Sequence, residues 1–115
     1  MQSNASYTVV ETRAYLADAT RILSEEERAA IVDAVAADPE IGAVMAGTGG
    51  VRKFRAALTG RGKRGGARVV YVFAAENTPI FLLAVFAKNE KANLTKAERN
   101  ALAGMVRTLV QDYGE

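Results

Sequence analysis

The sequence predicts one small α+β domain in which helices cover one face of a twisted antiparallel sheet. The chain has 115 residues, which is enough for one compact domain and too few for two. Half of its residues are hydrophobic and 24% are charged, a balance typical of folded rather than disordered chains. β-rich runs and helical apolar stripes follow one another in the order β-α-α-β-β-β-α.

The N-terminal third is expected to form one strand and two helices. Residues 7–11 are rich in β-forming side chains, and Thr12 can cap the helix that follows them. A second helix is predicted to begin after Ser24, because Ser24 and Glu27 have the spacing of a capping box. It is predicted to end at Asp38, since the residue before a proline avoids the helical region.

Three further β-rich runs are separated only by short turns and loops, at residues 51–58, 67–75 and 80–87. Short connections favour an antiparallel meander. Because side chains alternate along a strand, Phe54, Ala56 and Leu58 are predicted to share one side of the sheet. Lys53 and Arg55 then point to the opposite side.

The chain is predicted to end in a long helix. Thr95 and Glu98 form a second capping-box pattern, and apolar residues recur at helical spacing from Ala97 to Tyr113. We expect this stripe to pack on the sheet. With no linker and no internal repeat, residues 1–115 are interpreted as a single domain.

The composition excludes several kinds of site. The chain has no cysteine and no histidine, which excludes disulfides, thiolate metal sites and histidine acid–base catalysis. The carboxylates are scattered, so we expect neither a metal nor another cofactor. The longest apolar run, Ile80–Ala87, is too short for a membrane span, and residues 1–6 lack a signal-peptide pattern. We therefore expect a cytoplasmic protein without membrane partners.

Positive charge is concentrated in the middle of the chain. Residues 47–75 contain seven bases and no acid, whereas residues 1–46 contain eight acids and three bases. The seven bases are Arg52, Lys53, Arg55, Arg61, Lys63, Arg64 and Arg68. Glycines in the same stretch allow backbone amides to approach a ligand, and amides with basic side chains suit phosphate. The alternative is a solvated basic surface that binds nothing in particular.

Two nucleotide-binding motifs can be rejected here. Residues 60–65 fit the pattern G-x-G-x-x-G, but a dinucleotide site needs a helix directly after it, and this segment has strand-like sequence on both sides. Gly62-Lys63 is followed by Arg64 rather than Ser or Thr, which excludes a P-loop.

Three stretches of the chain form a combined pattern: residues 49–55, 60–71 and 81–95. Together they resemble the RelE-like toxins of type II toxin–antitoxin systems, and the HigB branch is the most similar. The resemblance implies a RelE-like fold and a ribosome-dependent endoribonuclease that cuts translated mRNA. It also implies a cognate antitoxin, a HigA-like helix-turn-helix protein through which the complex would bind operator DNA. The alternatives are a gyrase poison, as in the related ParE branch, or a basic module that only binds RNA.

RNA cleavage by 2′-OH attack needs a base, a stabiliser of the phosphorane and an acid, but no metal. Lys53 is our candidate for the base or proton-transfer group, because the neighbouring Arg52 and Arg55 disfavour its charged form. Arg55 and Arg68 are predicted to hold the phosphorane, since guanidinium is a bidentate donor. Lys88 is predicted to supply a charge or the acid.

Further residues are predicted to bind RNA without taking part in the chemistry. They are Arg52, Arg61, Lys63, Arg64, Tyr71 and Lys91. Tyr71 is expected either to stack on a base or to be a core aromatic residue with its hydroxyl at the rim. For Lys53 and Arg55, the alternative is that they only keep one face of the sheet hydrated.

Overall fold

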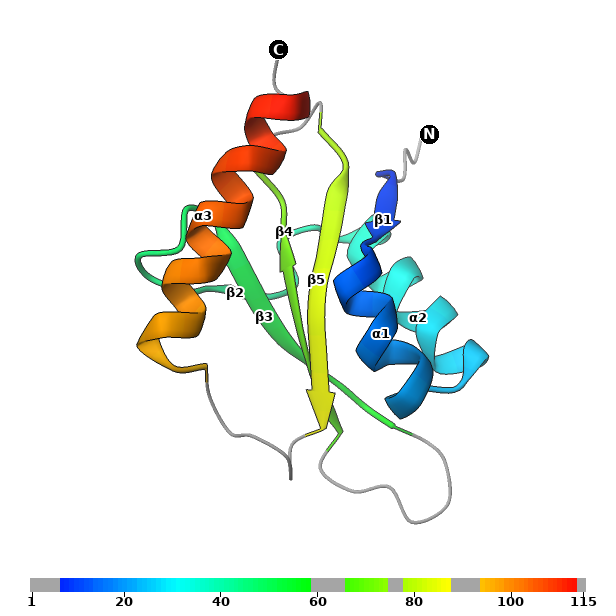
Figure 1. The fold of residues 1–115 in the computed structure, drawn as a ribbon. Helices are drawn as coiled ribbons and strands as arrows, with labels where there is room; N and C mark the ends of the chain where they lie inside the picture. The colour runs from blue at the N-terminus through cyan, green and yellow to red at the C-terminus, as the bar shows by residue number, and fades with distance from the viewer. Residues whose placement is uncertain (1–6, 59–65, 75–77, 88–93, 114–115) are drawn as a thin grey trace.

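The computed structural model of this chain describes residues 7–58, 66–74, 78–87 and 94–113 (Figure 1). In chain order, the elements are β1 (Val9–Glu11), α1 (Arg13–Ile22), α2 (Glu25–Ala37), β2 (Ala43–Val44), β3 (Val51–Ala56), β4 (Ala67–Val72), β5 (Ile80–Ala87) and α3 (Lys96–Tyr113). The α+β class and the predicted order of elements are confirmed, with the two-residue strand β2 as an addition. No helix in the described ranges is long and apolar enough to cross a membrane.

The sheet is mixed rather than wholly antiparallel. Its strand order is β1-β5-β4-β3-β2. β3, β4 and β5 pair as the predicted antiparallel meander, and the additional strand β2 pairs antiparallel with β3. β1 instead runs parallel to β5, with Val9 opposite Ile80. The chain between them, residues 12–79, is long enough for the crossover that parallel neighbours need.

Helices cover both faces of the sheet, which corrects the expectation of one covered face. In Figure 1, α1 and α2 lie on one side of the sheet and α3 on the other. Along β4, Val69 and Tyr71 belong to the core beneath α1 and α2, whereas Val70 and Val72 belong to the core beneath α3. Because side chains of both orientations are buried in the central strands, each face needs a cover of its own.

Local capping explains where the helices begin. The Thr12 hydroxyl accepts a hydrogen bond from the backbone amide of Tyr15. Ser24 and Glu27 form the predicted capping box, in which each side chain accepts from the backbone amide of the other. The side chains of Thr95 and Glu98 do the same ahead of α3. α2 ends at Ala37, one residue before the predicted boundary at Asp38.

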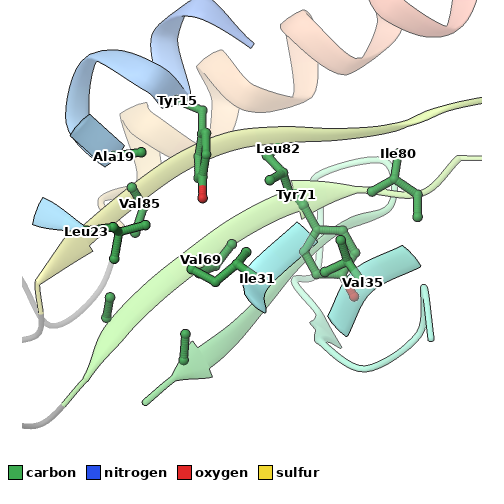
Figure 2. Close-up of a cluster of buried hydrophobic side chains, with 12 residues drawn as sticks. Tyr15, Ala19, Leu23, Ile31, Val35, Val69, Tyr71, Ile80, Leu82 and Val85 are labelled. Carbon is green, nitrogen blue, oxygen red and sulfur yellow. The ribbon is translucent and has the colours of Figure 1, made fainter. Parts of the chain in front are cut away.

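Two fully buried tyrosines anchor the core between the sheet and the helices α1 and α2 (Figure 2). Tyr71 lies on the central strand β4, and its hydroxyl is bonded to backbone groups at both ends of a loop. The Tyr15 hydroxyl is buried and has no hydrogen-bond partner among the described residues. Burial and the nearby negative charge of Glu11 raise the pKa of Tyr15 to about 12, although Arg28 acts in the opposite direction.

Candidate functional site

Three of the predicted catalytic residues share one face of the sheet, the face that α3 partly covers. Arg55 on β3 is directly opposite Arg68 on β4, so their side chains point the same way. Lys53 lies two residues from Arg55 on the same strand and is opposite Val70, a member of the core beneath α3. We call Lys53, Arg55 and Arg68 the cationic cluster.

The cationic cluster has no counter-charge in the part of the chain that the structure describes. None of its three side chains forms an ion pair or hydrogen bond with another described residue. The Nε atom of Arg68 is buried and has no acceptor there. Like charges directly opposite each other destabilise a strand pair, and buried donors normally have partners. Two opposed guanidinium groups of this kind suit a phosphate, whose oxygens accept bidentate hydrogen bonds.

Lys53 also lines a pocket beside α3. The pocket has a volume of about 360 Å³, and its walls come from Val44, Met45, Ala46, Lys53, Leu94 and Arg99. Arg99 was not among the residues predicted from the sequence. Only the packing of α3 against β3 brings it near Lys53, and no local spacing in the sequence indicates that contact.

Arg52 lies on the other face of the sheet, away from the cationic cluster. It is opposite Tyr71, and its guanidinium donates to the backbone carbonyls of Gly42 at 2.7 Å and Glu40 at 3.4 Å. The Glu40 carboxylate lies 3.9 Å away. The guanidinium of Arg52 therefore fastens a loop to β3 on the face opposite Lys53, and RNA binding by Arg52 stays a prediction. On its own side of β3, Lys53 has Val51 and Arg55 as strand neighbours, and only Arg55 is charged.

Tyr71 is a core residue and has no exposed ring with which to stack on a base. Its hydroxyl accepts from the Gly42 amide at 2.9 Å and donates to the Pro39 carbonyl at 2.7 Å. Its ring meets Phe54 edge to face, with centroids 5.9 Å apart. Burial raises the pKa of Tyr71, and the Gly42 hydrogen bond partly opposes that shift. The structure thus corrects the stacking prediction and supports the core alternative, except that the hydroxyl is buried rather than at the rim.

The tight approach at this loop also explains Gly42. A Cβ atom at this position would lie 2.8 Å from the Lys53 carbonyl oxygen and 2.9 Å from the Tyr71 ring. Glycine therefore allows the loop to sit directly against β3 and β4.

The other predicted site residues lie outside the described residues: Arg61, Lys63, Arg64, Lys88 and Lys91. Lys88 directly follows Ala87, the last residue of β5. Within the described ranges, no group of three histidine, cysteine, aspartate or glutamate side chains could hold a metal ion.

Comparison with known proteins agrees with this fold. A solved structure of a mutant of the E. coli toxin RelE in the free state matches with a TM-score of 0.58 and 18% sequence identity. The match covers 88% of this chain and 97% of that one. At this identity, the likeness concerns the fold alone.

The sequence itself matches the family model described as the RelE toxin of the RelE/RelB toxin–antitoxin system, over residues 9–113. This chain therefore belongs to the RelE toxin family. It is the toxin component of a toxin–antitoxin pair, and its partner is an antitoxin. The narrower assignment to the HigB branch stays a prediction.

Proposed function

We propose that this toxin is a ribosome-dependent endoribonuclease that cleaves translated mRNA and so inhibits translation. The observation that carries this proposal is the opposed pair of Arg55 and Arg68, with a buried Arg68 Nε that has no acceptor among the described residues. An RNA phosphodiester would supply both the missing negative charge and the missing acceptor. Membership of the RelE toxin family supports the same substrate.

The proposed reaction uses the RNA's own nucleophile. The 2′-oxygen bonds to the adjacent phosphorus while the bond from phosphorus to the 5′-oxygen breaks, which leaves a 2′,3′-cyclic phosphate and a 5′-hydroxyl. One proton leaves the 2′-hydroxyl and another is delivered to the 5′-oxygen, so the step is balanced without a metal or an external nucleophile. The protein must therefore move protons and stabilise charge.

The cationic cluster divides these tasks. Arg55 and Arg68 would hold the phosphorane oxygens, where negative charge increases in the transition state. Lys53, on the same side of β3, would act as the base or proton-transfer group. Lys88 follows β5 in the sequence, and we assign it an additional charge or the acid.

Recognition outside the cluster is proposed to depend on basic residues. Arg61, Lys63, Arg64 and Lys91 would bind phosphates of mRNA or ribosomal RNA. The antitoxin is proposed to be a HigA-like helix-turn-helix protein, through which the pair would bind operator DNA. Because the target is a translating ribosome, we propose that the toxin acts in the cytoplasm.

Primer-extension mapping of transcripts after induced expression tests this function. We expect the wild type to create new 5′ ends inside translated codons, and a reporter whose start codon has been removed should stay intact. Lys53→Ala and Arg55→Ala should weaken the cuts, whereas Arg13→Ala, which alters an exposed arginine on α1, should not. Unchanged transcripts together with a DNA-damage response would instead indicate a gyrase poison.

A further inference from the structure

We propose that Arg99 forms a second phosphate subsite beside Lys53, which holds the mRNA nucleotide next to the bond that is cleaved. This inference rests on the proposed function and adds a positioning residue to it. Its basis is the pocket between β2, β3 and α3, to which each of the two cations contributes from a different element.

The size and lining of the pocket fit one nucleotide. Its volume of about 360 Å³ lies within the range of small-ligand sites. The lining is mainly polar, and Val44, Met45 and Leu94 add a smaller apolar part that a ribose or base could contact; Val44 is 56% exposed. Lys53 and Arg99 are the charged residues of the lining, and none of the described residues that line it is acidic. A ligand with an apolar part and a negative group would match both features.

No contact among the described residues accounts for the position of Arg99. It lies in the first turn of α3, where the positive end of the helix dipole disfavours a cation. The N-terminus of the helix is already capped by Thr95 and Glu98. The Arg99 side chain is exposed and forms no ion pair with a described residue. A phosphate in the pocket would offset this unfavourable placement.

Lys53 connects the pocket to the cationic cluster. Its side chain lines the pocket, and Arg55 follows two positions later on the same face of β3. Residues two apart on a strand are separated by about 7 Å. That separation is comparable to the distance between successive phosphates along an extended RNA strand. An mRNA that places its scissile phosphate at Arg55 and Arg68 can therefore place a neighbouring phosphate beside Lys53, in the pocket that Arg99 also lines.

Cleavage on programmed ribosomes tests this subsite when the charge of one mRNA phosphate at a time is removed by a methylphosphonate. With unmodified mRNA, Arg99→Gln should raise the toxin concentration for half-maximal cleavage about tenfold. A neutral group at one phosphate beside the scissile bond should raise this concentration by a similar factor for the wild type. It should not change the concentration for Arg99→Gln. Arg107→Gln, an exposed arginine later on the same helix, is the matched control and should behave as the wild type.

Two results would overturn the subsite. One is an Arg99→Gln toxin that cleaves like the wild type. The other is an Arg99→Gln toxin that is weakened equally whichever phosphate is neutral, because this would show a general loss of charge rather than one lost contact.

A binding measurement separates the subsite from the proposed nuclease function. The same set of mRNAs is given a 2′-O-methyl group at the cleavage position, which blocks the attack, and binding of the toxin to the programmed ribosome is measured. The wild type could cut no mRNA and yet bind more weakly when one neighbouring phosphate is neutral, while binding of Arg99→Gln does not change. In that case the nuclease proposal fails and the subsite stands. If the neutral phosphate has no selective effect on wild-type binding, or if the toxin does not bind, the subsite is refuted.

Discussion

The two faces of the sheet differ in how their arginines are bonded, although the Tyr15 hydroxyl on the α1 and α2 face also has no partner among the described residues. On the α1 and α2 face, the Tyr71 hydroxyl and the Arg52 guanidinium are bonded to backbone groups of the same loop. On the α3 face, Arg55 and Arg68 are opposed without a counter-charge among the described residues, and Arg99 stands apart from any acid in the pocket that it lines. The first arrangement stabilises the fold, whereas the second reduces its stability and leaves donors available for a phosphate.

The largest effect is expected from Lys53. Lys53→Ala should lower the cleavage rate on programmed ribosomes by about 10²–10⁴-fold, the usual contribution of a general acid or base. Lys53→Arg is the informative control, since arginine keeps the positive charge but does not release its proton. If Lys53→Arg restores the rate, Lys53 acts through its charge alone and its proton-transfer role is wrong.

The opposite face should respond in stability rather than in activity. Tyr71→Phe leaves the Gly42 amide and the Pro39 carbonyl without their buried partner, so it should lower the free energy of unfolding by about 2–4 kcal/mol in urea denaturation. Cleavage per folded molecule should be retained. Tyr15→Phe is the matched control, because the Tyr15 hydroxyl has no hydrogen-bond partner in the described ranges, and it should leave the stability unchanged or slightly higher. Equal effects of the two substitutions would contradict this account of the core.

Tyr15 also predicts how stability changes in alkali. The ordinary tyrosine pKa is 10.0, and the pKa of Tyr15 in the folded protein is about 12. Below pH 10 the Tyr15 hydroxyl keeps its proton in both the folded and the unfolded state, so its contribution to stability is fully present. As the pH rises from 10 to 12, the unfolded chain loses this proton first, and about 2–3 kcal/mol of stability should be lost. Urea denaturation between pH 9 and 12 should show that the wild type loses more stability than Tyr15→Phe over this range. If the free energy of unfolding falls in parallel with pH for the two proteins, the prediction is wrong.

The smallest effect should be a gain in stability on the cationic face. Arg55→Gln removes the repulsion with Arg68 and should raise the free energy of unfolding by up to about 1 kcal/mol, while cleavage falls. Thermal denaturation at low and high salt measures this, because salt screens the repulsion and should reduce the gain. A loss of stability in Arg55→Gln would show that the arginine supports the fold instead.

Much of the local structure was predictable from the sequence. The capping residues Thr12, Ser24 and Thr95 act within a few positions of themselves, so short patterns identify them. Alternation along β3 correctly places Lys53 and Arg55 on the side opposite Phe54. These features depend only on residues that are close together in the chain, so the sequence alone is enough to predict them.

The errors concern partners far away in the chain. The parallel pairing of β1 with β5 joins Val9 to Ile80, and no local spacing encodes it. Arg99 reaches the pocket of Lys53 only through the packing of α3.

For Tyr71, the sequence did contain a local signal. Tyr71 follows Arg68 by three positions, and alternation along the strand therefore puts the two side chains on opposite faces. The same alternation separates Arg52 from Lys53.

A double-mutant cycle on Arg55 and Arg68 tests most directly whether this face holds the scissile phosphate. The cleavage rate of mRNA on programmed ribosomes is measured for the wild type, Arg55→Gln, Arg68→Gln and the double variant. Each single substitution should reduce the rate by about 10²–10³-fold, and the double variant should lose much less than the product of the two, because both groups hold the same phosphate. Single variants that cleave at the wild-type rate while remaining folded would contradict the account.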